Sequence, residues 1–199
     1  NRKSENAPIN IYAAGALTKS LDGSTLTEIG LMSEAGAVMF SNGALPIKSA
    51  QTMRRLLSYS SNFDCLISNR PIESSLSINT AAHESDFSLR LGLPSSPSVS
   101  ERIIVERDIA LAELTGGKLL IDLISASESL IAIKQAKLKY SNISCSVSIN
   151  HLSLNEKDIG DYRTFAKLDP PLREESDRLD LLNGINDGTI DVIVSSHDP

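Results

Sequence analysis

The fold class is decided by residues 119–139, which read LLIDLISASESLIAIKQAKLK. The first six residues, 119–124, form a short run rich in Leu and Ile, which is typical of a strand buried on both faces. From residue 126 to residue 139, apolar side chains recur at helical spacing, which predicts an amphipathic helix. Ser125 and Glu128 have the S-x-x-E spacing of a helix capping box. The stretch therefore predicts one strand followed by one helix.

The same alternation of short apolar runs and longer amphipathic stretches continues along the whole chain. Six buried strands are expected, at residues 9–14, 37–40, 65–67, 119–124, 144–149 and 191–194. Five helices are expected, at residues 26–35, 50–60, 99–114, 126–139 and 174–186. Strict alternation implies parallel strands joined by right-handed crossovers. The fold class is therefore α/β, with either a doubly wound sheet or a (β/α)8 barrel.

Local signals mark several ends of these elements. Ser98 and Glu101 form a second S-x-x-E pair, in which the hydroxyl accepts a bond from an early helix N–H and the carboxylate reaches back to the cap. Gly116 is expected to close helix 99–114, because a residue without Cβ can turn left-handed. The polar segment 71–97 is expected to be an extended loop over an active-site face.

The composition excludes several classes of protein. With 199 residues and 41% apolar residues, the chain lies well outside the signature of disorder. Lys and Arg total 19 against 25 for Asp and Glu, and this net charge of −6 argues against a nucleic-acid partner. No apolar run is long enough to span a membrane and the first residues are too polar for a secretory signal, so a cytoplasmic protein is expected. Cys65 and Cys145 each lie in an apolar run and are expected to be buried free thiols.

Several polar side chains are expected to play no chemical role. His83 lies in the polar segment 71–97 and is expected to be a solvated surface imidazole. Arg54 and Arg55 are expected to lie on a solvated helix face, as are the lysines of residues 134–139. The sequence after the first strand lacks the G-x-G-x-x-G pattern, which weighs against a nucleotide-binding Rossmann unit.

Six segments spread along the chain match, in order and spacing, the pattern of one known protein family. They read GALTK (15–19), EAGAVMFS (34–41), RLGLP (90–94), RDIALAELTG (107–116), KLDPPLR (167–173) and DGTID (187–191). Together they resemble dihydroorotase, the cyclic amidohydrolase of pyrimidine synthesis. The resemblance implies a metal-dependent (β/α)8 barrel in which the six expected strands are the third to the eighth. Residues 1–199 would then be the central part of one barrel domain, without its first two strands and its C-terminal segment.

The resemblance also implies where the family's chemistry would be found in this chain. Asn42 stands where the family has a carboxylate after the fourth strand. Ser68 and Leu123 stand where it has two imidazole ligands, after the fifth and sixth strands. The proton-moving Asp of the last strand aligns with Ser196. We therefore expect no bound metal and no catalytic residue in this chain.

The remaining family-aligned positions are expected to be remnants of the same site. His151 and His197 retain imidazoles, Asn150 replaces a histidine, and Asp169 replaces the Asn that precedes the Pro-Pro-Leu-Arg run. The expected vestigial pocket comprises Asn42, Ser68, Leu123, Asn150, His151, Asp169, Ser196 and His197. A nucleophile triad of Ser68, His151 and Asp169 is disfavoured, because its order and spacing match no elbow motif.

The resemblance favours a dihydroorotase-like protein that has lost catalysis, needs no cofactor, and serves as a structural or regulatory partner. The expected partner is aspartate transcarbamoylase or a second copy of the chain, with no nucleic acid and no membrane. One alternative is an active, divergent dihydroorotase or cyclic amidohydrolase, which would hydrolyse a cyclic amide C–N bond with Zn or another divalent metal. Another is a barrel that keeps a ligand pocket without turnover.

Overall fold

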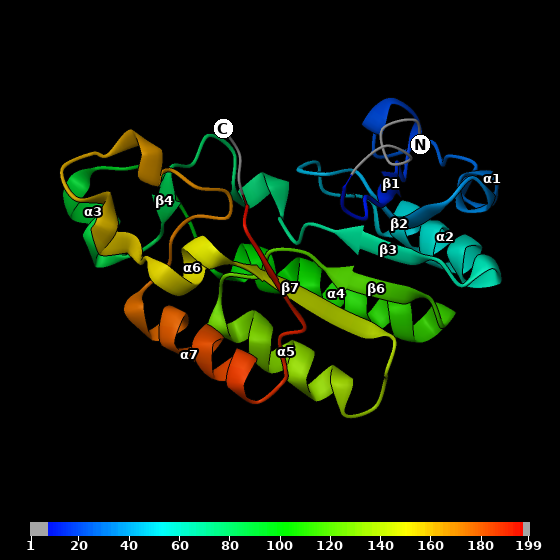
Figure 1. Cartoon of the computed structure of the whole chain (residues 1–199). Coiled ribbons are helices and arrows are strands. Elements are labelled where there is room, and N and C mark those ends of the chain that lie inside the picture. The colour runs from blue at the N-terminus through cyan, green and yellow to red at the C-terminus, as the bar shows by residue number, and fades with distance from the viewer. Residues whose placement is uncertain (1–7, 197–199) are drawn as a thin grey trace. The chain divides into compact units, whose positions relative to one another are not determined.

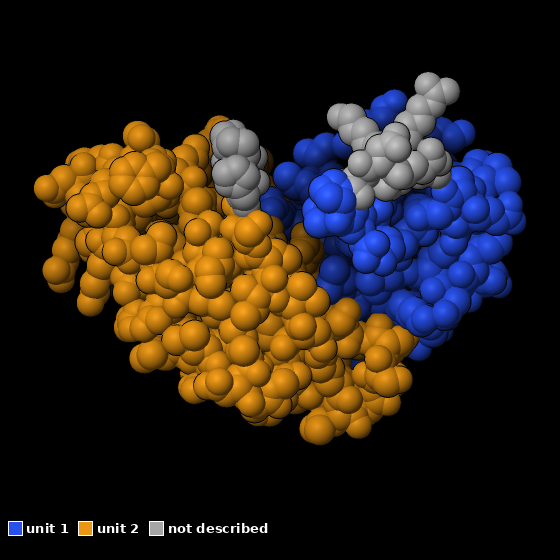
Figure 2. All heavy atoms as spheres, viewed as in Figure 1, with its two compact units in different colours: residues 1–70, 108–120 blue, residues 71–107, 121–199 orange. Residues whose placement is uncertain are grey.

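The computed structural model describes residues 8–196, which form two compact units. Unit 1 comprises Asn1–Arg70 and Asp108–Leu120, and unit 2 comprises Pro71–Arg107 and Ile121–Pro199. Figure 2 colours them separately. The expected single barrel domain stays a prediction.

The strands form a six-stranded sheet whose strand order equals their order along the chain. The pairs β1–β2, β2–β3 and β7–β8 are parallel, which confirms the α/β class with parallel strands. The strands are β1 (Ala13–Gly15), β2 (Ala37–Ser41), β3 (Leu66–Asn69), β6 (Lys118–Ile121), β7 (Ile143–Ser148) and β8 (Val192–Val194).

All five expected helices are present, and two short ones accompany them (Figure 1). The expected helices are α1 (Ile29–Glu34), α2 (Ala50–Ser60), α4 (Val99–Thr115), α5 (Ser127–Lys137) and α7 (Glu175–Asn186). The additional ones are α3 (Asp86–Leu91) and α6 (Ile149–Ser153), both too short to show a helical period in sequence. Gly116 follows α4 with a φ of 70°, as expected. No helix of residues 8–196 combines the length and apolar character needed to cross a bilayer.

The core of unit 1 lies between α2 and the strands. Phe40 of β2, Ile67 of β3 and Met53 of α2 are fully buried. Gly117 precedes β6 at a close approach, where an added Cβ would lie 2.9 Å from the carbonyl oxygen of Leu57. Only glycine allows the chain to pass this near to α2.

The core of unit 2 lies between β7 and the helix pair α5 and α7. Val147 of β7, Ile133 of α5 and Leu181 of α7 are buried. The two cysteines, Cys65 in unit 1 and Cys145 here, are buried free thiols, which confirms the prediction. Burial raises the pKa of the Cys145 thiol to about 12, so this sulfur remains protonated.

The segment expected to be an extended loop, residues 71–97, has a fold of its own. Strand β4 (Ala82–His83) pairs in parallel with β5 (Ser95–Ser96), and α3 lies between them in the chain. A short helical turn, η3 (Ser74–Leu76), precedes them. The expectation of an extended loop was wrong because the apolar residues that pack against this segment are distant in sequence and come close to it only in the folded chain. Its cluster joins Ala82 to Ile159, Ala166 and Leu172, with two further turns, η4 (Glu156–Ile159) and η5 (Thr164–Ala166).

Candidate functional site

A buried ion pair lies in unit 2, between the first turn of α4 and the chain just before α7. The Nη2 atom of Arg173 is 3.6 Å from Oε2 of Glu101, and each side chain is only 3% exposed. Burying a charge is costly unless it is paired and hydrogen-bonded. Each charge therefore compensates the other, and further polar groups must complete the hydrogen bonding of the carboxylate and the guanidinium.

Ser125, in the turn before α5, supplies that hydrogen bonding. Its hydroxyl donates to Oε2 of Glu101, and its backbone N–H donates to Oε1 at 3.0 Å. The N–H of Ala126 donates to the same carboxylate at 3.1 Å. Nε of Arg173 donates to Oγ of Ser125 at 2.9 Å. A carboxylate from α4 therefore binds the free N–H groups at the start of α5, where negative charge is favoured.

The predicted capping box at α5 is wrong. In each S-x-x-E pair, the glutamate bonds the serine of the other pair. The N-cap of α5 is Ala126, which makes no side-chain cap bond. Glu101 binds Ser125, whereas Oε1 of Glu128 accepts from the hydroxyl of Ser98 at 3.4 Å. The sequence signal was real, since each motif begins a helix. The partner of each glutamate depends on the packing of α4 beside α5, which three-residue spacing does not encode.

His83, on β4, is buried against the same network, so the expected surface position is wrong. Its Nδ1 is 3.0 Å from Nη1 of Arg173. Because a guanidinium only donates, Nδ1 must accept, and the neutral ring carries its proton on Nε2. Burial, and then the positive charge of Arg173, lower the pKa of His83 below its usual 6.5. His83 is therefore a neutral acceptor in this network.

His151, in α6, is a second buried imidazole and one of the predicted site residues. Its Nε2 lies 3.1 Å from the carbonyl oxygen of Pro170 and 3.3 Å from that of Pro171. Carbonyls only accept, so Nε2 carries the proton and Nδ1 has a free lone pair. Within residues 8–196 this buried Nδ1 has no hydrogen-bond partner. Burial lowers the pKa of His151, which keeps the ring neutral.

Asn42, at the end of β2 in unit 1, uses its amide to hold the backbone. Its Oδ1 accepts from the N–H groups of Leu17 and Thr18, each at 3.1 Å. Its Nδ2 donates to Oγ1 of Thr18 at 2.7 Å. A carboxylate lacks the amide donor used here. The residue at this family position is therefore engaged in supporting the fold.

Leu123, Ser68 and Ser196 occupy three more of the predicted site positions. Leu123 is buried with a φ of 59°, and its N–H donates to Oγ of Ser146 at 2.9 Å. Oγ of Ser146 in turn donates to Asp122 at 2.6 Å. Ser68 of β3 and Ser196 after β8 each have a buried hydroxyl without a partner in the part of the chain that the structure describes. At these three positions the chain therefore has two hydroxyl groups and one hydrocarbon side chain, and no imidazole or carboxylate.

The predicted vestigial pocket is divided between the two units, so its assembly stays a prediction. Asn42 and Ser68 belong to unit 1, whereas Leu123, Asn150, His151, Asp169 and Ser196 belong to unit 2. His197 lies outside the described residues. Across residues 8–196, no three His, Cys, Asp or Glu side chains come together as a metal site would require. The side chain of Arg173 contacts Glu101, Ser125 and His83.

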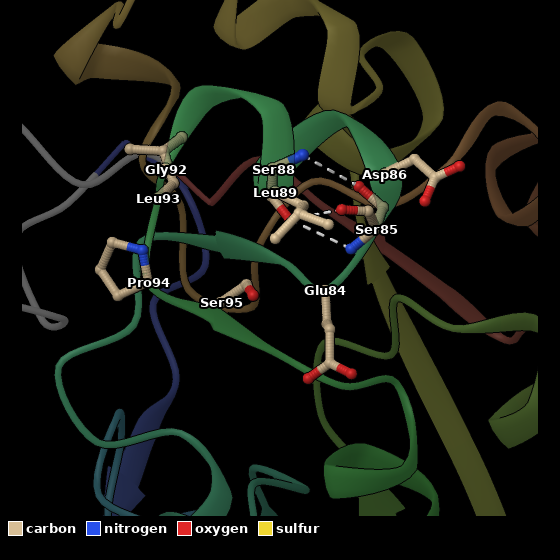
Figure 3. A pocket seen from close by; sticks show the side chains of 9 residues that line it. All are labelled: Glu84, Ser85, Asp86, Ser88, Leu89, Gly92, Leu93, Pro94 and Ser95. Carbon is tan, nitrogen blue, oxygen red and sulfur yellow. Dashed lines mark hydrogen bonds between the residues drawn. The ribbon is translucent and has the colours of Figure 1, made fainter.

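Unit 2 also contains an open pocket of about 810 Å³ within the segment 71–97 (Figure 3). Ser85 and Ser88 form a capping box at the start of α3, which holds one wall. The lining contains none of the predicted site residues: it consists of Glu84, Ser85, Asp86, Ser88, Leu89, Gly92, Leu93, Pro94 and Ser95. Sequence reasoning missed this pocket because it missed the elements that form it.

Solved structures of a hydantoinase and of a dihydroorotase have a similar fold. L-hydantoinase (dihydropyrimidinase) from Arthrobacter aurescens matches 98% of this chain and 46% of its own, with a TM-score of 0.77 and 21% identity. A dihydroorotase from Campylobacter jejuni matches 96% of this chain and 45% of its own, with a TM-score of 0.56 and 12% identity. These similarities confirm the predicted fold, a partial (β/α)8 barrel of the amidohydrolase type.

The sequence comparisons indicate the family. The model of the dihydro-orotase-like family matches residues 1–129. A dihydroorotase from Ehrlichia chaffeensis is 40% identical over 199 residues, which cover 100% of this chain and 44% of the relative. One from Desulforapulum autotrophicum is 38% identical over 95% of this chain and 44% of the relative. The chain thus spans less than half the length of these relatives. It belongs to the dihydroorotase-like family.

Proposed function

We propose that this chain is a non-catalytic dihydroorotase-like protein of pyrimidine biosynthesis that acts as a structural or regulatory partner of aspartate transcarbamoylase. The observation that carries the proposal is the bonding of Asn42. At a position where the family resemblance implies a carboxylate, both ends of an amide hold Leu17 and Thr18. A group used in this way stabilises the fold and offers little to a metal or a substrate.

The divalent metal that the family implies does not fit the residues at the aligned positions. Such metals need imidazole or carboxylate ligands in a defined geometry. Leu123 has no donor atom in its side chain, and Oδ1 of Asn42 already accepts two backbone hydrogen bonds. We therefore assign no chemical step to a metal in this chain.

The contacts that maintain the fold support a structural role, in which the protein has to keep its shape but need not catalyse a reaction. The buried pair of Glu101 and Arg173 ties α4, the start of α5 and the chain before α7 to one another. The close approach of Gly117 to Leu57 likewise maintains the packing of unit 1. A protein whose surface is recognised by a partner requires such a framework, whereas it does not require the proton-moving carboxylate that Ser196 replaces.

The partnership is tested by mixing the protein with aspartate transcarbamoylase and measuring mass by size-exclusion chromatography with light scattering. We expect one species heavier than either component, with both chains in the peak. Elution of two separate species at concentrations well above 10 µM, roughly the range of weak specific complexes, would contradict the proposal. The protein alone serves as the control for self-association, the other expected interaction.

A second candidate is an active, divergent cyclic amidohydrolase, favoured by the 38–40% identity to relatives named dihydroorotase. The two candidates differ in metal content and turnover. Protein expressed with added Zn, Mn or Co and then dialysed is analysed for bound metal and assayed with dihydroorotate and carbamoyl aspartate. We expect metal far below one equivalent and no turnover. Stoichiometric metal with measurable turnover would replace the first candidate by the second.

A further inference from the structure

A groove of about 610 Å³ runs along the exposed side of α2 in unit 1. It is separate from every residue discussed above as a family-aligned position. Its size lies in the range of small-molecule sites. The lining consists of Leu26, Gln51, Arg54, Arg55, Ser58, Tyr59 and Asn62.

The groove is positively charged although the chain as a whole is acidic. Its lining has two guanidinium groups and no carboxylate, in a protein whose net charge is −6. Neither Arg54 nor Arg55 forms an ion pair with any residue that the structure describes. Consecutive positions on a helix point about 100° apart, so the two side chains reach the groove from different directions. Each guanidinium has five N–H donors, so Arg54 and Arg55 can both donate to an anion in the groove.

The lining also includes an aromatic ring, that of Tyr59, and the amide of Asn62. The ring of Tyr59 packs edge-to-face on Phe63, with centroids 5.3 Å apart and an interplanar angle of 87°. Phe63 in turn packs against Gly30 of α1, where an added Cβ would lie 2.8 Å from the ring. Nδ2 of Asn62 donates to the carbonyl oxygens of Ser58 and Tyr59, at 3.2 and 3.3 Å. Tyr59 and Asn62 therefore each have a packing or hydrogen-bond partner within unit 1.

We propose that this groove binds a small organic polyanion, whose phosphate or carboxylate groups contact Arg54 and Arg55 and whose apolar part packs against Leu26 and Tyr59. The guanidinium is planar and donates in pairs, which matches both anionic groups. The proposal is independent of the proposed function, because it uses no residue of the family-aligned site. Nothing in it requires the chain to be catalytically active or inactive.

The proposal is tested by isothermal titration calorimetry, in which the full chain in a low-salt buffer is titrated with pyrophosphate and, separately, with citrate. The groove variant is Arg54→Gln with Arg55→Gln. Its matched control is Arg90→Gln with Lys139→Gln, which removes two positive charges from exposed positions elsewhere. We expect the groove variant to bind about tenfold more weakly, the loss typical of one charged hydrogen bond, and the control to bind as the unmodified protein does.

Two further measurements separate recognition from general attraction of anions. Arg54→Lys with Arg55→Lys keeps both charges but removes the paired donors, so we expect its affinity to fall as well. Unfolding midpoints of all variants show whether each one is folded. The proposal is overturned if neither probe binds, if the groove and control variants lose affinity equally, or if the lysine variant binds as tightly as the unmodified protein. Pyrophosphate binding without citrate binding would assign the site to phosphates, and the reverse to carboxylates.

Discussion

Oε2 of Glu101 and Nη2 of Arg173 lie 3.6 Å apart, in side chains that are almost entirely shielded from solvent. The two residues are 72 positions apart in sequence. Because the carboxylate also accepts from Ser125 and Ala126, this one contact joins three segments of unit 2. The stability of unit 2 should therefore depend on it.

Replacing Glu101 by Gln should destabilise the protein strongly. The guanidinium of Arg173 would remain buried without its counter-charge, and breaking a buried pair in this way costs roughly 3–5 kcal/mol. Urea unfolding followed by circular dichroism measures the change in the free energy of unfolding. Glu106→Gln on the same helix is the control, because its pair with Arg102 is exposed and should contribute below about 1 kcal/mol. Equal losses in the two variants would contradict the role given to Glu101.

Acidification should destabilise the protein through its buried imidazoles. The pKa values of His83 and His151 are lowered in the fold, so below pH 6.5 the unfolded chain binds protons that the folded chain does not. The free energy of unfolding must then fall as the pH falls from about 7 toward 5.

His83→Asn isolates one of these contributions. The Asn side-chain oxygen can accept from Arg173 as Nδ1 of His83 does, but it does not titrate. Urea midpoints measured at pH 7.5, 6.5 and 5.5 should therefore fall less steeply in this variant than in the unmodified protein. Parallel curves for the two proteins would show that His83 is not a source of the acid sensitivity.

Asn42→Ala should lower the free energy of unfolding by about 2–4 kcal/mol, because it leaves two buried backbone N–H groups without acceptors. Amide hydrogen exchange should also accelerate at Leu17 and Thr18. Asn62→Ala is the matched control, since Asn62 is exposed and bonds only to carbonyls of its own helical segment. If Asn62→Ala lowered the free energy of unfolding as much as Asn42→Ala does, the hydrogen bonds of Asn42 would not have the stabilising role given to them.

Gly117→Ala should cost more than Gly184→Ala. At Gly117 the new Cβ would meet the carbonyl oxygen of Leu57 at 2.9 Å, and backbone cannot move aside easily. At Gly184, inside α7, it would meet the tip of the Leu130 side chain at 2.9 Å, and a helical Ala recovers about 1 kcal/mol of helix propensity. Thermal unfolding should show a clear loss of about 1–3 kcal/mol for Gly117→Ala and a smaller change for Gly184→Ala. The opposite order would contradict this packing.

Elements with a long periodic pattern could be predicted from the sequence, and short ones could not. Helix α2 begins and ends where predicted, because eleven residues suffice for the alternation of buried and exposed positions. The strand expected at residues 9–14 overlaps β1 (Ala13–Gly15) only at residues 13 and 14, and Ile9 is 70% exposed. An apolar run indicates burial only if a neighbouring element covers it, and the run itself does not show whether one does.

The sequence by itself determined the order of strands and helices and the family, because both depend on patterns local to each segment. It also showed which donor atoms the family-aligned positions lack, since Leu123 has none in any conformation. Only the tertiary structure decided that Glu101 binds Ser125, that His83 is buried beside Arg173, and that Arg54 and Arg55 line one groove. The physical reason is that these contacts depend on which helices and strands pack together, and many sequences with the same local patterns would pack them with other partners.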